Sequence, residues 1–573
     1  MQHKILFVLL SLNFFSFDGC EQKALSDDNS AFEYREIYLP EGIGNEAREL
    51  GLNSVDNDWG IWGHNLSVVL PENPAHSVYA TVNGQTNTEQ FCFSSDRLYQ
   101  YIERYILDLV GERRTTRFSI IPQDNYISCL CEQCVAKGCT YNDASPAVFS
   151  MIERLATRFP HHLFFTSYYL TTRSLPSRPL PSNAGVLYSA IHYYLAPVPT
   201  TREQETEKRL EQWGQMTSHL YVWDYIDNFD DYLTPYPLFS IMQRRLQLYR
   251  RTGVAGVFLN GSGPDYSTFS RIRTHVLAAL LRDPDCDWRP LLEETCRRLY
   301  PEAGATIARF MLQQEDLVTS GGRMLPIYQG ADVILKTYVD AASFCTFHDE
   351  LLQLLPTTQG EERQELTTLC QALAFTRLEI KRIQADTEGC EPLLQQLAQL
   401  PLKGIRCYNE SYWTLESYIQ EYRSMLHAAR ESQKKNRLLR KQLVPLTALD
   451  EEYTDISILT DGLAGIPSNY HCGHLISSAD PALKLAIPQV GLLRHLRVGL
   501  TYNAKHHIGL PSKVTLSVRG REIAAVEPKV VSGLPQRVVV DFDIPSDIEG
   551  TLVLTLVRNP EEKTMALDEV EGW

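Results

Sequence analysis

The pattern of apolar and polar positions divides the chain into three parts. Between residues 32 and 290, short β-rich runs alternate with segments in which apolar residues recur every three or four positions. From 291 to 445 the pattern is almost purely helical, and from 446 to 573 segments of alternating polarity are separated by Gly, Pro and Asp. We therefore expect a multi-domain α/β and all-β protein, as suits a chain of 573 residues.

The first part predicts a TIM-like barrel. Strands that alternate with helices form a parallel sheet, and eight such repeats predict a (β/α)8 barrel over 32–290. Little helix separates the second and third candidate strands, so a doubly wound sheet is the alternative. The candidate strands are 34–39, 50–55, 65–70, 117–122, 163–169, 186–193, 220–226 and 254–260.

The other two parts predict different architectures. In 291–445, Leu and Ala recur at spacings of three and four, which predicts a helical region packed on or after the barrel. The alternating segments of 446–573 are typical of a β-sandwich.

The N-terminus has the features of an export signal. Lys4 precedes a short apolar run, and Gly19 stands before Cys20, as in a bacterial lipoprotein signal peptide that covers residues 1–20. We expect acylation of Cys20, with simple secretion as the alternative, and a polar tether over 21–31. No later stretch is apolar and long enough to cross a bilayer. The sequence thus predicts a protein anchored by lipid in the bacterial cell envelope, at the periplasmic or outer-membrane surface.

The charge and the aromatic content of the chain restrict the classes of molecule that we expect it to bind. The chain has 70 acidic and 54 basic residues, a formal net charge of -16, which disfavours nucleic acid and anionic membranes. Its 29 Tyr and 7 Trp suit stacking on sugar rings, although core packing also uses aromatic residues. We expect an oligo- or polysaccharide ligand, and contact with the membrane only through the lipid anchor.

Several motifs resemble a known family. Trp62-Gly63-His64-Asn65, Pro122-Gln123-Asp124-Asn125 and Tyr221-Val222-Trp223-Asp224-Tyr225 occur in that order. Together with their surroundings they resemble the bacterial domain-of-unknown-function 4838 family over residues 31 to about 300. The resemblance implies a glycoside-hydrolase-like barrel in an exported protein of glycan-degrading bacteria.

A second resemblance concerns the C-terminal part. Leu459-Thr460-Asp461-Gly462 and Leu567-Asp568-Glu569-Val570 look like parts of a discoidin-type (coagulation factor 5/8 type C) module over about 455–573. Such a module would imply carbohydrate binding by the sandwich.

Two aspartates are the candidate catalytic residues. Glycoside hydrolysis uses two carboxyl groups, and in a barrel such groups lie at the C-terminal ends of strands. Asp124 follows the predicted strand 117–122, and Asp224 lies near the end of 220–226. We expect Asp124 to be the general acid/base and Asp224 the nucleophile or base. The alternatives are a turn or helix cap for Asp124 and a hydrogen-bonded structural role for Asp224.

Other polar and aromatic side chains near predicted strand ends are candidates for substrate binding. A bidentate Arg35 would fix a carboxylate or a hydroxylated sugar. For the acidic residues Asp227, Asp230 and Asp231 we expect a solvated turn. The candidate binding residues are Arg35, His64, Asn125, Tyr193, Trp223, Tyr225 and Asn228.

Four closely spaced cysteines have two interpretations. Cys129, Cys131, Cys134 and Cys139 could supply four thiolates to a structural Zn²⁺. In an exported protein disulfides are equally expected, with Cys131–Cys139 or Cys129–Cys134 as the possible pairs. The hydrolytic mechanism itself requires no cofactor.

The sequence therefore predicts a glycoside hydrolase that acts on a glycan outside the cytoplasm by a two-carboxylate mechanism. The alternative is a non-catalytic glycan-binding lipoprotein on a hydrolase-like scaffold, because a fold does not fix a function. A lyase or a substrate-assisted mechanism, in which one carboxylate suffices, ranks third.

Overall fold

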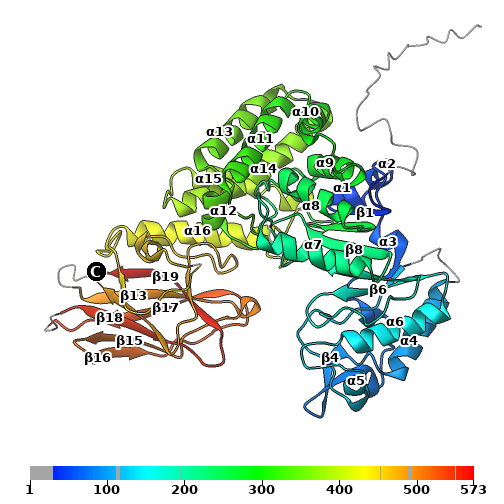
Figure 1. Cartoon of the computed structure of the whole chain (residues 1–573). Coiled ribbons are helices and arrows are strands. Elements are labelled where there is room, and N and C mark those ends of the chain that lie inside the picture. The colour runs from blue at the N-terminus through cyan, green and yellow to red at the C-terminus, as the bar shows by residue number, and fades with distance from the viewer. Residues whose placement is uncertain are drawn as a thin grey trace, which may run out of the picture.

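A computed structural model describes residues 30–110, 117–193, 195–451, 453–487, 493–546, 548 and 550–573. The expected signal peptide, Cys20 and nearly all of the tether lie outside the described residues. Figure 1 shows a sheet with helices at the N-terminal side, a group of helices, and a C-terminal pair of sheets. No described helix has the length and apolar character needed to cross a membrane.

A seven-stranded parallel sheet forms the centre of the N-terminal part. Its order is β1-β9-β8-β7-β6-β5-β2, and all of its pairings are parallel. The strands are β1 (Tyr34–Tyr38), β2 (Trp59–Ile61), β5 (Arg117–Ser119), β6 (Leu163–Tyr168), β7 (Ala184–Ser189), β8 (His219–Tyr225) and β9 (Gly256–Asn260). Six of them overlap predicted strands, so the alternating α/β pattern is confirmed.

The predicted strands at 50–55 and 65–70 are wrong. Residues 50–54 form no strand and lead into α3 (Val55–Asp58), while η2 (Leu66–Val69) is a 3₁₀ helix. In place of these two strands the structure has only β2. Among the described residues the sheet therefore has seven strands, and its edge strands β1 and β2 share no ladder.

Side chains join the two edges of the sheet. Trp59 Nε1 in β2 donates a hydrogen bond to the Tyr34 hydroxyl in β1 at 2.9 Å. The Tyr34 hydroxyl in turn donates to Glu36, whose other carboxylate oxygen accepts from the Val55 amide at 2.8 Å. Glu36 is fully buried, and desolvation raises its pKa to about 8. The sheet thus curls until its edges meet, although no eighth strand closes it among the described residues.

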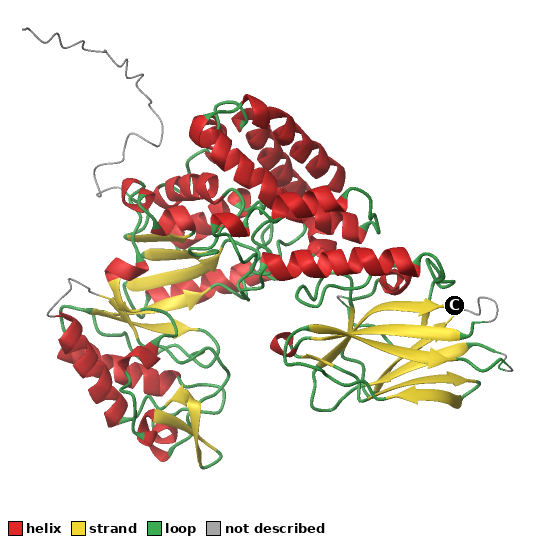
Figure 2. Ribbon diagram, turned by 180° about the vertical axis from the view of Figure 1, so that it is seen from behind, coloured by secondary structure: helices red, strands yellow, loops and turns green. Residues whose placement is uncertain are grey.

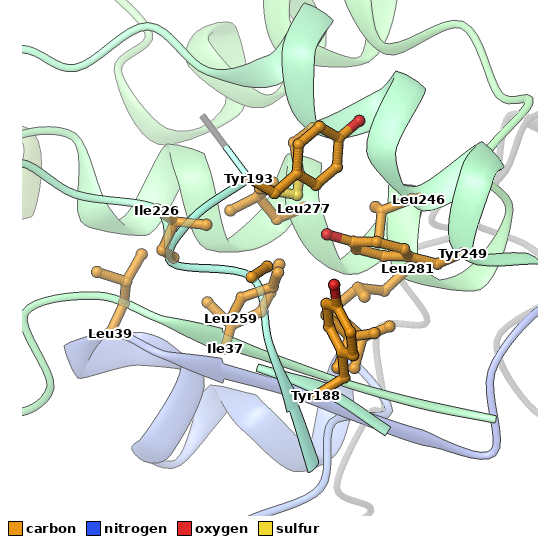
Figure 3. Packing of buried hydrophobic residues seen from close by; sticks show 14 of the residues in the cluster. Ile37, Leu39, Tyr188, Tyr193, Ile226, Leu246, Tyr249, Leu259, Leu277 and Leu281 are labelled. Carbon is orange, nitrogen blue, oxygen red and sulfur yellow. The ribbon is translucent and has the colours of Figure 1, made fainter. Parts of the chain in front are cut away.

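Helices cover the outer face of this sheet (Figure 1). Apolar strand residues such as Ile37 and Leu259 point toward Leu246, Leu277 and Leu281 in the helical layer (Figure 3), and all five are fully buried. The helices are α1 (Pro40–Ile43), α2 (Glu46–Glu49), α4 (Asp96–Val110), α6 (Ser145–Arg158), α7 (Thr201–Gly214), α8 (Phe239–Arg251) and α9 (Ser270–Arg282). Alternation along the strands places aromatic residues inside the curl, among them Tyr34, Trp59, Phe165 and Tyr221.

A hairpin is inserted between β2 and β5. It consists of β3 (Tyr79–Val82) and β4 (Gln85–Phe91), preceded by η3 (His76–Val78). Asn83 and Gly84 at its tip both have positive φ, which a two-residue turn of this type requires. The short helix α5 (Glu132–Ala136) lies on the loop that follows β5.

The predicted helical region is present. It comprises α10 (Trp288–Leu299), α11 (Gly304–Gly321), α12 (Ala331–Thr337), α13 (Ala341–Leu354), α14 (Gly360–Ile383), α15 (Cys390–Leu397) and α16 (Leu415–Ser432). Leu369, Leu373 and Leu378 of α14 are all buried, as expected of a central helix in such a bundle.

The C-terminal part forms two antiparallel sheets, which Figure 2 shows as two layers. Their orders are β10-β12-β18-β15-β16 and β11-β19-β13-β17, with β14 beside β19. The strands are β10 (Val444–Pro445), β11 (Leu475–Ser477), β12 (Ala482–Ile487), β13 (His495–Tyr502), β14 (Ile508–Gly509), β15 (Lys513–Val518), β16 (Arg521–Val526), β17 (Gln536–Asp543), β18 (Leu552–Val557) and β19 (Thr564–Gly572). The expected sandwich is therefore present, whereas its discoidin-type identity stays a prediction.

Candidate active site

The C-terminal ends of the parallel strands surround an aromatic floor. The indole rings of Trp62 and Trp223 are stacked, with centroids 5.0 Å apart, and both residues are partly exposed. Phe258 lies against both rings, at centroid distances of 4.6 Å and 4.7 Å. Such a surface suits the apolar face of a sugar ring, and the predicted binding residue Trp223 lies there.

Asp124 lies in the loop that follows the C-terminal end of β5. It is exposed, and Tyr169 lies near its carboxylate. Burial and the charge of Asp124 raise the pKa of Tyr169. The ring of His64 lies 6.0 Å from that of Tyr169, and its Nδ1 is 2.6 Å from Pro122 O. His64 thus contacts the loop that carries Asp124.

The β3–β4 hairpin holds the Asp124 loop through hydrogen bonds. Asn125 Nδ2 donates to Glu89 O at 2.9 Å, and Gln90 Nε2 donates to Asn125 Oδ1 at 3.0 Å. The Gln123 amide donates to Gln90 Oε1, also at 3.0 Å. Asn125 therefore braces the loop through its side chain, and the hairpin keeps Asp124 beside the end of β5.

A second carboxylate reaches this end of the sheet from the helical region. Glu410 lies in the loop before α16, and its amide donates to Phe229 O at 2.9 Å. Tyr328 lies near the Glu410 carboxylate, and burial and the charge of Glu410 raise the pKa of Tyr328. Desolvation raises the pKa of Glu410, and the charges of Asp230 and Asp124 add to this, against the lowering by Tyr328. The charge of Asp124 is therefore close enough to act on Glu410.

Tyr225 is the last residue of β8, and its hydroxyl is 3.4 Å from Ser189 Oγ. Burial raises the pKa of Tyr225. The ring of Phe229 lies 5.9 Å from that of Tyr225 and 5.5 Å from that of Tyr328. We call Tyr169, Tyr225 and Tyr328 the tyrosine rim.

The sequence analysis missed Glu410 and Tyr328. Both lie in loops of the helical region, far along the chain from the strands they approach. One pattern could have indicated Glu410: Tyr408-Asn409-Glu410-Ser411-Tyr412-Trp413 is an aromatic turn sequence inside an otherwise helical part.

Asp224 does not join this site. Trp223 and Tyr225 face the inside of the curl, so the alternation of the strand turns Asp224 toward the helices. It is fully buried and forms an ion pair with Arg245, while Tyr249 donates to it at 2.6 Å. Desolvation raises the pKa of Asp224. The structure therefore separates Asp224 from Asp124 by the sheet itself.

Tyr193 belongs to the same buried group. The Arg245 guanidinium lies 3.8 Å from the centroid of the Tyr193 ring, and Arg245 also donates to the Tyr193 carbonyl. Figure 3 shows Tyr193 and Tyr249 among the apolar side chains of this layer. The arrangement gives Tyr193 a packing role next to Asp224.

Arg35 and Asn228 brace the backbone. Arg35 Nη1 donates to Phe32 O at 2.5 Å and its Nη2 to Gly51 O at 2.9 Å. Asn228 Nδ2 donates to Gln329 O at 2.8 Å, and the Gln329 amide donates back to Asn228 Oδ1 at 3.1 Å. Asn228 thereby anchors the loop that carries Tyr328.

The predicted solvated turn after β8 is largely buried instead. Asp227 is 1% exposed and pairs with Arg273 at 2.8 Å. Asp231 is 6% exposed and accepts from the amides of the next residues. Asp230 pairs with His471 of the C-terminal part at 2.9 Å. Asp230 therefore links the loop after β8 to the C-terminal part, and Asp227 links it to α9.

A cavity of about 370 Å³ adjoins the rim at the ends of β6 and β7. Tyr169 and Ser189 line it on the side of the rim, and Arg173, Arg202 and His192 line it elsewhere. It therefore offers cationic groups beside the aromatic floor.

The cysteine cluster differs from the expected set in one member. Cys129, Cys131 and Cys134 lie together with Cys92, which directly follows β4. Cys139 Sγ is 3.7 Å from Ala144 O, outside that group. All described cysteines are free thiols, so neither expected disulfide is present among them.

Comparison with known proteins identifies the family. A family model described as "Domain of unknown function (DUF4838)" matches residues 26–312, half of the chain. The chain belongs to this family. The resemblance in its sequence motifs is thereby confirmed, and no match was found among curated protein sequences.

Solved structures similar to this DUF4838 protein include carbohydrate-active enzymes. A family GH115 4-O-methyl-α-glucuronidase with specificity for decorated arabinogalactans is 10% identical, with a TM-score of 0.37, over 87% of this chain and 70% of that one. A GH138 enzyme targeting pectin rhamnogalacturonan II is 9% identical, with a TM-score of 0.34, over 95% and 88%. A chitosan-binding module from Paenibacillus sp. IK-5 is 14% identical, with a TM-score of 0.17, over 24% and 97%.

Proposed function

We propose that this DUF4838 protein is a glycoside hydrolase whose two catalytic carboxyl groups are Asp124 and Glu410. The observation that carries the proposal is that both approach the same end of the sheet: the Asp124 loop contacts His64 beside Tyr169, and the Glu410 amide bonds to Phe229, whose ring contacts Tyr225. Hydrolysis of a glycosidic bond requires two carboxyl groups on either side of the scissile bond. The aromatic floor beside them supplies the surface on which a sugar ring rests.

The electrostatics assign a role to each group. The pKa of Glu410 is raised by desolvation and by neighbouring carboxylates, which favours its protonated form. Glu410 is accordingly the general acid that protonates the leaving oxygen. Asp124 is then the base that activates water, or the nucleophile that attacks the anomeric carbon. Asp224 has a structural role in this mechanism, through its buried ion pair with Arg245.

The rim also orients the substrate. Tyr169 and Tyr328 lie near the two carboxylates, and their hydroxyls would position these groups against the bond that is cleaved. The adjoining cavity presents Arg173 and Arg209, which suit a carboxylate or another anionic group on the glycan, while its third arginine, Arg202, pairs with Glu205 at 3.3 Å. The proposed substrate is therefore an acidic glycan.

The proposal also covers the location of the protein and the role of the sandwich. The N-terminal apolar run, with Gly19-Cys20 after it, supports export and a lipid anchor in the cell envelope. The sandwich would bind the same polysaccharide, which raises its effective concentration near the rim.

Incubation with a panel of neutral and acidic polysaccharides and aryl glycosides tests the proposal. We expect sugar release by the wild-type chain and a loss of about 10²–10⁴-fold in rate for Glu410→Gln. Glu211→Gln, which changes an exposed glutamate on α7, is the matched control and keeps full activity. Glycan binding by the wild type without release from any substrate would instead support a non-catalytic binding protein.

A further inference from the structure

Four thiols converge beneath the Asp124 loop. The Sγ atoms of Cys92, Cys129, Cys131 and Cys134 all lie within 4.8 Å of one another. The separation is 3.6 Å between Cys92 and Cys131, and 3.7 Å between Cys92 and Cys134. One thiol follows the hairpin strand β4, and the other three come from the loop after β5 and from α5. The group therefore joins two segments that are separate in sequence.

These separations fit a metal better than disulfides. A disulfide holds its two sulfur atoms about 2.05 Å apart. Four thiolates around Zn²⁺, with Zn–S bonds of about 2.3 Å, lie about 3.8 Å from one another at the corners of a tetrahedron. The two measured separations agree with that edge length, and Cys92 is near two other thiols at once, which pairing with a single partner does not explain.

The surroundings of the sulfur atoms suit thiolates. Cys92, Cys129 and Cys134 are at most 5% exposed, and Cys131 is partly exposed. The Thr81 amide donates to Cys129 Sγ at 3.3 Å, and Ser94 Oγ lies 3.2 Å from Cys134 Sγ. Such outer hydrogen bonds orient and stabilise sulfur ligands of a metal.

We propose that Cys92, Cys129, Cys131 and Cys134 bind one structural Zn²⁺. Four protein ligands leave no open position for water or substrate, so the site is structural and takes no part in the chemistry. Each thiol gives up its proton on binding, and the free energy of metal binding adds to the stability of the folded state. Cys139, the fourth residue of the sequence motif, is not a ligand.

The site has a consequence for the rim. The metal joins the hairpin to the loop 122–134, and the same hairpin holds Asn125 and Gln123 through Gln90. The Zn²⁺ therefore fixes the backbone on which Asp124 stands. The metal site itself does not depend on the proposed hydrolase activity, and metal content and sugar release are measured separately.

Metal analysis of the purified chain tests the proposal. We expect one zinc per chain by inductively coupled plasma mass spectrometry, lost in Cys92→Ser and kept in Cys139→Ser. Since Cys92→Ser can also misfold, the wild-type chain is exchanged with Co²⁺ as well. A tetrahedral thiolate site then shows sulfur-to-cobalt charge-transfer absorption in the near ultraviolet and d–d bands in the visible.

Two results would overturn the zinc site. One is a metal-free chain whose non-reduced peptide map contains a disulfide between any of these four cysteines. The other is zinc retained by a folded Cys92→Ser variant but lost from Cys139→Ser, which would give the fourth ligand position to Cys139.

Discussion

The indole ring of Trp62 is stacked on that of Trp223, with an angle of 9° between the ring planes and 5.0 Å between centroids. Trp62 follows β2, and Trp223 lies in β8, with three strands between them in the sheet. Neighbouring strands lie about 4.8 Å apart, so a flat sheet would separate these two strands by about 19 Å. The contact therefore shows that the sheet of seven described strands curls into a barrel-like shape.

The first prediction concerns this stack. Trp62→Ala removes one half of the aromatic floor, so glycan affinity should fall by the equivalent of about 0.5–1.5 kcal/mol or more. Trp62→Phe keeps an aromatic face and should retain most of the affinity. Isothermal titration with a bound glycan measures both variants, and equal affinities for Trp62→Ala and wild type would show that the sugar does not rest there.

The second prediction concerns the pH dependence of the rate. Because the pKa of Glu410 is raised and the protonated form is the acid, activity should fall as pH rises through that pKa. Glu410→Gln should lose this alkaline limb together with most of the rate. A pH–rate profile of both proteins checks this, and an unchanged alkaline limb in the variant would assign the acid to another group.

The third prediction separates Asp224 from the chemistry. Asp224→Asn leaves Arg245 buried without its partner charge, which should cost about 3–5 kcal/mol of stability. Asp124→Asn changes an exposed residue and should leave the thermal midpoint nearly unchanged while the rate falls. Calorimetry of the two variants gives the comparison. If the Asp224→Asn chain instead keeps its stability and loses only activity, Asp224 is a catalytic residue.

The fourth prediction concerns Glu36 at the junction of the sheet edges. Its pKa is about 8 in the folded chain against an ordinary value of 4.5, so between these values the folded state holds a proton that the unfolded state has lost. The stability that this proton gives is complete below pH 4.5 and is lost as pH rises toward 8. The slope is about 1.4 kcal/mol per pH unit.

Unfolding at pH 5.5 and pH 7.5 measures this slope. Glu36→Gln has no titrating group at this position, so its free energy of unfolding should change less between the two pH values than that of the wild type. Equal changes in both proteins would contradict the raised pKa.

Six of the eight predicted strands are present, because each of them is a short β-rich run before or after a helical pattern. It failed at 65–70 for a physical reason: Leu66 and Val69 are buried while Val68 is exposed, which is the three-residue spacing of a helical turn. The direction of Asp224 was predictable, since Tyr221, Trp223 and Tyr225 alternate with it along β8.

The second carboxylate of the site was not predictable in the same way. Glu410 reaches the rim only because its amide bonds to Phe229 and because Asn228 positions the loop of Tyr328. Contacts of this kind between distant segments leave no periodic pattern in the sequence. Cys92 was likewise not predictable as a member of the cysteine cluster, because it lies far along the chain from the closely spaced motif.

The most direct test of the account measures binding and release of the same acidic glycan by the wild type and by the Asp124→Asn/Glu410→Gln double variant. The account predicts that both proteins bind the glycan and that only the wild type releases sugar from it. Release by the double variant at the wild-type rate would contradict the assignment of Asp124 and Glu410 as the catalytic pair.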